Sequence, residues 1–111
     1  MKAAASDALF KSLADPTRRA IFERLCRKGE HTVWMLTERA DVSQQAVSKH
    51  LDVLGRAGLV RCEREGRETR YSARTEGLAP LSDWVEVFVP NLADKFEALV
   101  AGFDKKDRGR K

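Results

Sequence analysis

The clearest chemical pattern in the sequence lies between residues 43 and 57, where polar side chains that can pair with DNA bases recur at helical spacing. On a helix, Val47, Leu51 and Leu54 fall on one face and polar residues occupy the opposite face. Glutamine pairs with adenine through two hydrogen bonds, serine donates to several base edges, and lysine reaches guanine or a phosphate. The candidate DNA-binding residues of this segment are Ser43, Gln44, Gln45, Ser48, Lys49, His50 and Arg56.

The same polar face has a purely structural interpretation, because any helix at a protein surface carries polar residues toward water. For residues 43–57 considered alone the structural interpretation is favoured, and it is the short helix before them and the arginine-rich hairpin after them that favour DNA binding. His50 lies near the edge of the apolar face, where a structural hydrogen bond is favoured over base reading.

Arginine supplies most of the positive charge in the segment that runs from residue 43 to residue 76. Six of the seven positive charges between residues 43 and 76 are arginines, whose planar guanidinium suits phosphate oxygens and base edges. Arg64, Arg67 and Arg70 could reach flanking phosphates or a minor groove, as basic arms do. The alternative is that they pair with the glutamates interleaved among them. Contact with DNA is favoured for Arg67, because it lies at a turn.

The surrounding segments predict a helix-turn-helix. Asp15, Thr32 and Ser43 have the side chains of helix N-caps, and Gly29 and Gly58 are typical of residues just past a helix end. Only two or three residues join the third predicted helix to the fourth. The predicted helices span residues 6–14, 16–28, 33–40 and 43–57.

The pattern changes after Gly58. Residues 59–64 and 68–73 predict two strands, and Gly66 between them suits the positive φ of a tight hairpin. From residue 78 to residue 103 apolar residues recur every three or four positions, and Pro90 should kink this last helix. We therefore predict a mainly α fold with a small β-hairpin, a winged helix-turn-helix of about five helices and a two-stranded wing.

This fold leaves room for one domain. Residues 1–103 are expected to form a single DNA-binding and dimerisation domain, and residues 104–111 a charged, flexible tail. The segment from Leu78 to Phe103 carries more large apolar residues than a domain of this size needs for its own core. A stripe that packs within one subunit is the alternative to an interface between two copies. The candidate interface residues are Leu9, Phe10, Leu81, Trp84, Phe88, Leu92, Phe96 and Leu99.

Three motifs, in this order and spacing, closely resemble the ArsR/SmtB family of bacterial winged-helix repressors. They are Leu13–Ile21 (LADPTRRAI), Val42–Leu51 (VSQQAVSKHL) and Leu54–Val60 (LGRAGLV). The resemblance implies a homodimer that binds an inverted-repeat operator in double-stranded DNA, in or near its own promoter. It also implies that the fourth helix enters the major groove and that the hairpin serves as the wing.

The sequence departs from the metal-sensing members of that family. Thr32–Leu36 (TVWML) stands where they carry a Cys-x-Cys motif, and residues 77–103 contain no histidine or cysteine. Both familiar metal sites are missing, so the chain resembles the metal-independent branch. We expect no metal and no cofactor, and the sequence leaves the inducer open.

The remaining alternatives belong to other classes of protein. A thiol switch on the same scaffold would use Cys26 or Cys62, but Cys26 is expected on an apolar helix face, where thiols are usually inert. An enzyme is excluded, because no phosphate-binding loop, metal signature or catalytic triad is present. A winged helix used only for protein contacts is disfavoured by the polar face of residues 43–57 and the arginines.

Overall composition sets the outer limits. The chain has 111 residues and a formal net charge of +4, which permits an acidic partner without naming one. No apolar run approaches the roughly 18 residues that a membrane span needs, and the first seven residues lack the apolar stretch of a signal peptide. We therefore expect a cytoplasmic protein without a membrane partner.

Overall fold

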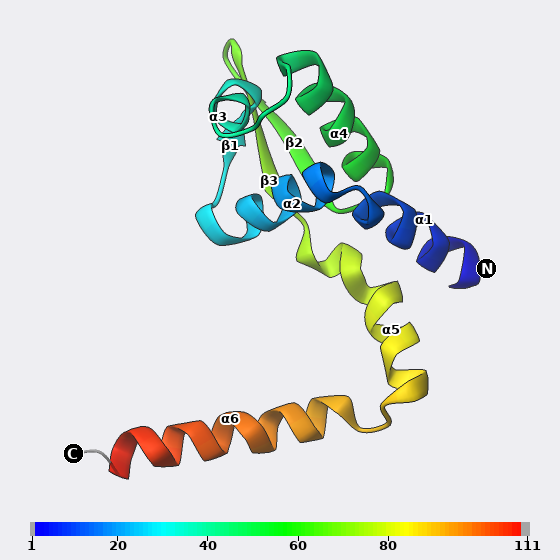
Figure 1. The fold of residues 1–111 in the computed structure, drawn as a ribbon, viewed down its shortest axis with the longest axis vertical. Helices are drawn as coiled ribbons and strands as arrows, with labels where there is room; N and C mark the ends of the chain where they lie inside the picture. The colour runs from blue at the N-terminus through cyan, green and yellow to red at the C-terminus, as the bar shows by residue number, and fades with distance from the viewer. Residues whose placement is uncertain (1, 110–111) are drawn as a thin grey trace. The chain divides into compact units, whose positions relative to one another are not determined.

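The computed structural model describes residues 2–109, and the side chains of residues 6–102. The chain divides into two compact units, the first ending at Leu81 and the second beginning at Ser82, and each is described by itself. Figure 1 shows its helices and strands. They are α1 (Lys2–Ala14), α2 (Pro16–Lys28), β1 (His31–Thr32), α3 (Val33–Glu38), α4 (Gln44–Arg56), β2 (Val60–Glu65), β3 (Glu68–Ala73), the 3₁₀ helix η1 (Thr75–Leu78), α5 (Ala79–Phe88) and α6 (Leu92–Gly109).

Helix α2 begins and ends where its capping residues predict. The Asp15 carboxylate accepts a hydrogen bond from the backbone N–H of Arg18 at 2.9 Å, and Pro16 occupies the first helical position. That hydrogen bond lowers the pKa of Asp15, because it favours the ionised form. At the other end Gly29 has a φ of +84° and donates to the carbonyl of Leu25 at 3.1 Å.

The helix-turn-helix is confirmed, with a shorter first helix than predicted. Thr32 caps α3 by accepting from the N–H of Met35 at 3.1 Å, and α3 ends at Glu38 instead of residue 40. Ser43 caps α4 in the same way, accepting from the N–H of Ala46 at 3.1 Å. Each short polar side chain thus satisfies a backbone donor that has no partner inside its own helix.

The core of the first unit lies where α1, α2, α3, α4 and β2 meet. Val47 and Leu54 are 0% exposed and Leu51 is 1% exposed, so the predicted apolar face of α4 is the buried face. Leu25 from α2 and Leu36 from α3 belong to the same buried cluster. Burial of each leucine side chain contributes about 1.5–3 kcal/mol, which holds α4 in one rotational setting.

The predicted two-stranded wing is present as β2 and β3, and a third strand joins it to form the sheet. The strands are antiparallel in the order β1-β3-β2, with Glu65 opposite Glu68 across a two-residue turn. Gly66 has a φ of +60° at the first turn position, as the tight hairpin requires. The extra strand β1 pairs His31 with Tyr71. Two residues are too short for an alternating pattern, so the sequence gives no signal for β1.

The last apolar segment is two helices, where one kinked helix was predicted. Helix α5 ends at Phe88 and α6 begins at Leu92. Between them Pro90 lacks a backbone donor, and Asn91 has a φ of +62°, in the left-handed region that ends a helix. Helix α6 continues to Gly109 and so includes most of the segment predicted as a tail; residues 110–111 lie outside the described residues. No helix in the described part of the chain is long and apolar enough to cross a membrane.

A close backbone approach joins the wing to η1. A Cβ atom at residue 77 would collide with the carbonyl oxygen of Gly58, which follows α4 and has a φ of +78°. Next to this contact, Leu59 donates to the carbonyl of Leu54 at 2.9 Å, and Arg74 donates to the carbonyl of Leu59 at 2.7 Å. Glycine at residue 77 therefore lets the chain that leaves β3 pass against the chain that enters β2.

Substituting Gly77→Ala should lower the free energy of unfolding by about 1–3 kcal/mol, because the backbone must move to admit the methyl group. Gly55→Ala is the control: its nearest neighbour is Val60 Cγ2 at 3.9 Å, so it should leave stability unchanged or raise it by up to about 1 kcal/mol. Urea denaturation followed by circular dichroism measures both variants. Equal effects of the two substitutions would contradict the close approach.

Candidate DNA-binding surface

Helix α4 presents its polar side chains away from the core. Gln44, Gln45, Lys49 and Arg56 are exposed and Ser48 is half-buried. The helix packs on α2, α3 and β2 through its opposite face. In Figure 1 the first turn of α4 and the β2–β3 turn lie toward the same end of the first unit. This end combines the positive end of a helix dipole with hydrogen-bonding side chains and guanidinium groups, the chemistry that suits a DNA groove.

His50 makes the structural hydrogen bond that the sequence favours. It is half-buried, and its Nδ1 accepts from a terminal nitrogen of Arg18 at 3.4 Å, because a guanidinium can only donate. Arg18 also donates to the carbonyls of Ser12 and Lys11, the latter at 3.0 Å, at the end of α1. One side chain of α2 thus ties the last turn of α1 to α4. The sequence analysis did not identify Arg18 as a positioning residue. Its positive charge inside the LADPTRRAI motif is the signal that could have done so.

The wing arginines fall into two groups. Arg64 and Arg67 are exposed, and no carboxylate of residues 6–102 lies within ion-pair distance of either. Arg70 is half-buried and pairs with Glu68 at 3.0 Å. Pairing with the interleaved glutamates therefore accounts for Arg70, while Arg64 and Arg67 present their charge to solvent.

Both cysteines are free thiols at the surface. The prediction that Cys26 lies on a buried face is wrong, because the core covers Ile21, Phe22 and Leu25 and leaves the last turn of α2 exposed. Partial desolvation and the negative charge of Glu23 raise the pKa of Cys26, which makes its thiol less reactive. Two effects raise the pKa of Tyr71 in β3: the larger is desolvation by burial, and the smaller is its hydrogen bond with Cys62. Among the residues whose side chains are described, no three metal-ligating groups come together.

The predicted interface residues separate by burial. Leu9 is 1% exposed in the core of a single chain, and Leu81 packs against that core, so neither offers much surface to a partner. Phe10 is 41% exposed on α1. In the second unit, Leu92 is half-buried, while Trp84, Phe88, Phe96 and Leu99 are exposed. Sequence reasoning missed Val87 and Val100, which lie beside them on α5 and α6 and which the three-residue spacing could have found.

Known proteins share both the sequence and the fold. A family model described as a helix-turn-helix domain matches residues 13–63. The chain is 39% identical over 87 residues to an uncharacterized HTH-type transcriptional regulator, YuzN of Bacillus subtilis, an alignment that covers 72% of this chain and 95% of YuzN. It is 32% identical over 81 residues to the transcriptional repressor SdpR of Bacillus subtilis, with 73% of this chain and 89% of SdpR covered. An ArsR-like transcriptional regulator from Rhodococcus sp. RHA1 matches the fold with a TM-score of 0.69 and 30% identity, over 92% of each chain.

The chain belongs to the ArsR family of transcriptional repressors. It is therefore a DNA-binding regulator of transcription, and not an enzyme. The three sequence motifs led to the right family, and the winged helix-turn-helix is confirmed. Within the ArsR fold, α3 and α4 form the helix-turn-helix, and β2 and β3 form the wing.

The reactivity of Cys26 follows from its surroundings. In a Cys62→Ser chain, iodoacetamide should label Cys26 in the native protein, because the thiol is exposed. The labelling rate should rise with pH through a midpoint above that of free cysteine, since a raised pKa lowers the thiolate fraction at any pH below it. Mass spectrometry measures the rate. Adding Glu23→Gln to this chain should lower the pH midpoint of labelling. A midpoint below that of free cysteine in the chain with Glu23 present would contradict the prediction and indicate an activated thiol.

Proposed function

We propose that this protein is a homodimeric repressor that binds an inverted-repeat operator near its own promoter. In this proposal α4 lies in the major groove and the β2–β3 hairpin contacts the flanking backbone. The observation that carries it is the orientation of α4: its apolar face is fully buried, so Gln44, Gln45 and Lys49 are exposed on the other face. The first turn of α4 lies toward the same end of the unit as the β2–β3 turn (Figure 1). An α-helix presented in this way fits the major groove of B-form DNA.

The candidate residues take different roles in the proposal. Gln44, Gln45, Ser48 and Lys49 read base edges from the first two turns of α4. Arg56, Arg64 and Arg67 contact phosphates, because they are exposed. Ser43, His50 and Arg70 position the others, since each already makes a hydrogen bond inside the chain: the helix cap, the bond with Arg18 and the ion pair with Glu68.

A second copy of the chain would account for the apolar surface of the second unit. Phe88 and Phe96 are 65% and 64% exposed, and Val87 is 73% exposed. Several large apolar side chains exposed on two helices are typical of an interface between subunits. Two-fold symmetry would place two α4 helices on half-sites about one helical turn apart. We further propose that the repressor acts in the cytoplasm and needs no metal to bind DNA.

Binding to DNA should depend on the outward face of α4. Two DNA duplexes serve as probes: one carries the sequence upstream of the protein's own gene and the other a scrambled sequence. Replacing both Gln45 and Lys49 with alanine should weaken binding to the upstream duplex by about 10-fold or more, since each lost contact with a base is worth roughly 1–3 kcal/mol. Arg67→Ala should weaken binding to the upstream and scrambled duplexes alike. It should also make the slope of log affinity against log salt concentration shallower by about one, the change expected when one phosphate contact is lost.

Fluorescence anisotropy at two salt concentrations measures these affinities. Arg27→Ala, which removes the same charge from the exposed end of α2, is the matched control and should bind as the wild type does. Wild-type affinity in the Gln45/Lys49 variant would contradict the proposed role of α4. Equal, weak binding of the wild type to both duplexes would contradict recognition of its own promoter.

The dimer should depend on α6. Replacing Phe96 or Leu99 with glutamate should convert the dimer to a monomer, because it buries an unpaired charge at the interface. Analytical ultracentrifugation measures the mass, and circular dichroism checks that the helices remain. Glu97→Gln, on the same helix, should leave the dimer intact. A wild-type chain that sediments as a monomer would contradict the proposed assembly.

A further inference from the structure

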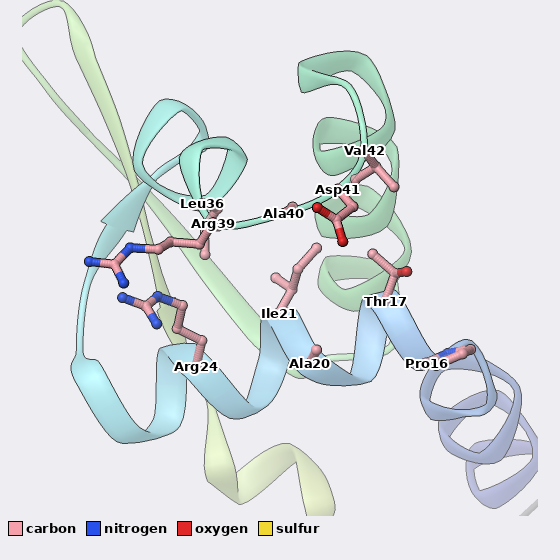
Figure 2. A pocket seen from close by; sticks show the side chains of 10 residues that line it. All are labelled: Pro16, Thr17, Ala20, Ile21, Arg24, Leu36, Arg39, Ala40, Asp41 and Val42. Carbon is pink, nitrogen blue, oxygen red and sulfur yellow. The ribbon is translucent and has the colours of Figure 1, made fainter.

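A cavity of about 430 Å³ opens in the first unit, between α2 and the turn that joins α3 to α4. Figure 2 shows the side chains that line it. Ile21 and Leu36, both buried, and the small side chains of Ala20 and Ala40 give it an apolar wall. A cavity of this size and character suits a small organic molecule, because apolar walls with a few polar groups are typical of ligand pockets.

Two arginines line one end of this cavity. The side chains of Arg24, from α2, and Arg39, just after α3, extend toward the same end in Figure 2. No carboxylate of residues 6–102 lies within ion-pair distance of either group. Two neighbouring positive charges repel each other, and an anion between them removes that repulsion. The planar guanidinium offers parallel donors that match the two oxygens of a carboxylate.

Arg24 is held in place by a buried histidine. Its Nε donates to Nε2 of His31 at 3.2 Å, and His31 is only 5% exposed. Because a guanidinium nitrogen only donates, Nε2 of His31 is the acceptor and Nδ1 carries the proton, which it donates to the carbonyl of Gly29 at 2.7 Å. The bond uses Nε of Arg24 and leaves both terminal nitrogens for a ligand. A group held in this way loses little freedom on binding, which favours affinity.

The other end of the cavity has a different character. Asp41, from the turn before α4, and Thr17, from α2, lie there together in Figure 2. The carboxylate of Asp41 repels a second negative charge, so one ligand carries its anionic group at the arginine end only. Inorganic phosphate would leave the apolar wall uncovered. The groups along the cavity therefore match an anion with an apolar body.

We propose that this cavity binds a small organic carboxylate, with its carboxylate between Arg24 and Arg39 and its apolar body against Ile21 and Leu36. The cavity borders the turn that sets the position of α4, so an occupant contacts the segment between the two helices of the helix-turn-helix. Any effect of the carboxylate on DNA binding rests on the proposed function, whereas binding of the carboxylate to the cavity does not.

Nuclear magnetic resonance of the ¹⁵N-labelled chain without DNA tests the binding. The probes are benzoate, benzamide, which has the same body without the charge, and acetate, which has the charge without the body, all at constant ionic strength. Benzoate should shift the Nε–H signal of Arg24 and the amide signals of Ala40 and Asp41 along saturable curves. The other two probes should bind at least about 10-fold more weakly, because each lacks one of the two complementary parts.

Arg39→Ala should weaken benzoate binding by about 10-fold or more, the loss expected of one charge-assisted pairing. Arg27→Ala, on the same helix as Arg24 and outside the cavity, should bind benzoate as the wild type does. Circular dichroism checks that both variants fold. Linear, unsaturated shifts, equal binding by the two variants, or shifts confined to Trp84 and Phe88 would overturn the proposal. A different result would also overturn it: benzoate does not bind, and Arg39→Ala lowers DNA affinity whereas Arg27→Ala does not. Arg24 and Arg39 would then contact a DNA phosphate.

Discussion

The arrangement of the candidate DNA-binding surface depends on the burial of one face of α4. Val47, Leu51 and Leu54 recur at positions that a helix brings to one side, and the core formed by α1, α2, α3 and β2 encloses all three. Turning the helix about its axis would expose these side chains, at a cost of about 1.5–3 kcal/mol each. The outward direction of Gln44, Gln45 and Lys49 is therefore a consequence of what the helix buries.

Contacts made by one side chain of α2 and by the backbone beside the wing complete this arrangement. Arg18 donates to the end of α1 and to His50, so a single guanidinium joins α1, α2 and α4. Gly58 and Gly77 let the chain that enters the wing and the chain that leaves it pass in direct contact. The position of the hairpin relative to α4 thus depends on two glycines, because a side chain at residue 77 would separate them.

Two regions of the chain remain outside the candidate DNA-binding surface, and their chemistry differs. The second unit exposes large apolar side chains, which favour a second copy of the same chain. The cavity between α2 and the α3–α4 turn combines apolar walls with two arginines that have no carboxylate partner among residues 6–102. Apolar area favours a protein partner, whereas a small pocket with converging donors favours a small ligand.

The features that depend on local chemistry could be predicted from the sequence. The caps at Asp15, Thr32 and Ser43, the buried face of α4 and the hairpin turn at Gly66 follow from residue type and spacing, and the motifs led to the ArsR family. Tertiary structure alone decided which side chains far apart in the chain meet. It placed Leu9 in the core and Cys26 at the surface, paired His31 with Tyr71 in a third strand, and brought Arg24 and Arg39 to the same cavity. Periodicity describes one element at a time, whereas these outcomes depend on which elements pack against each other.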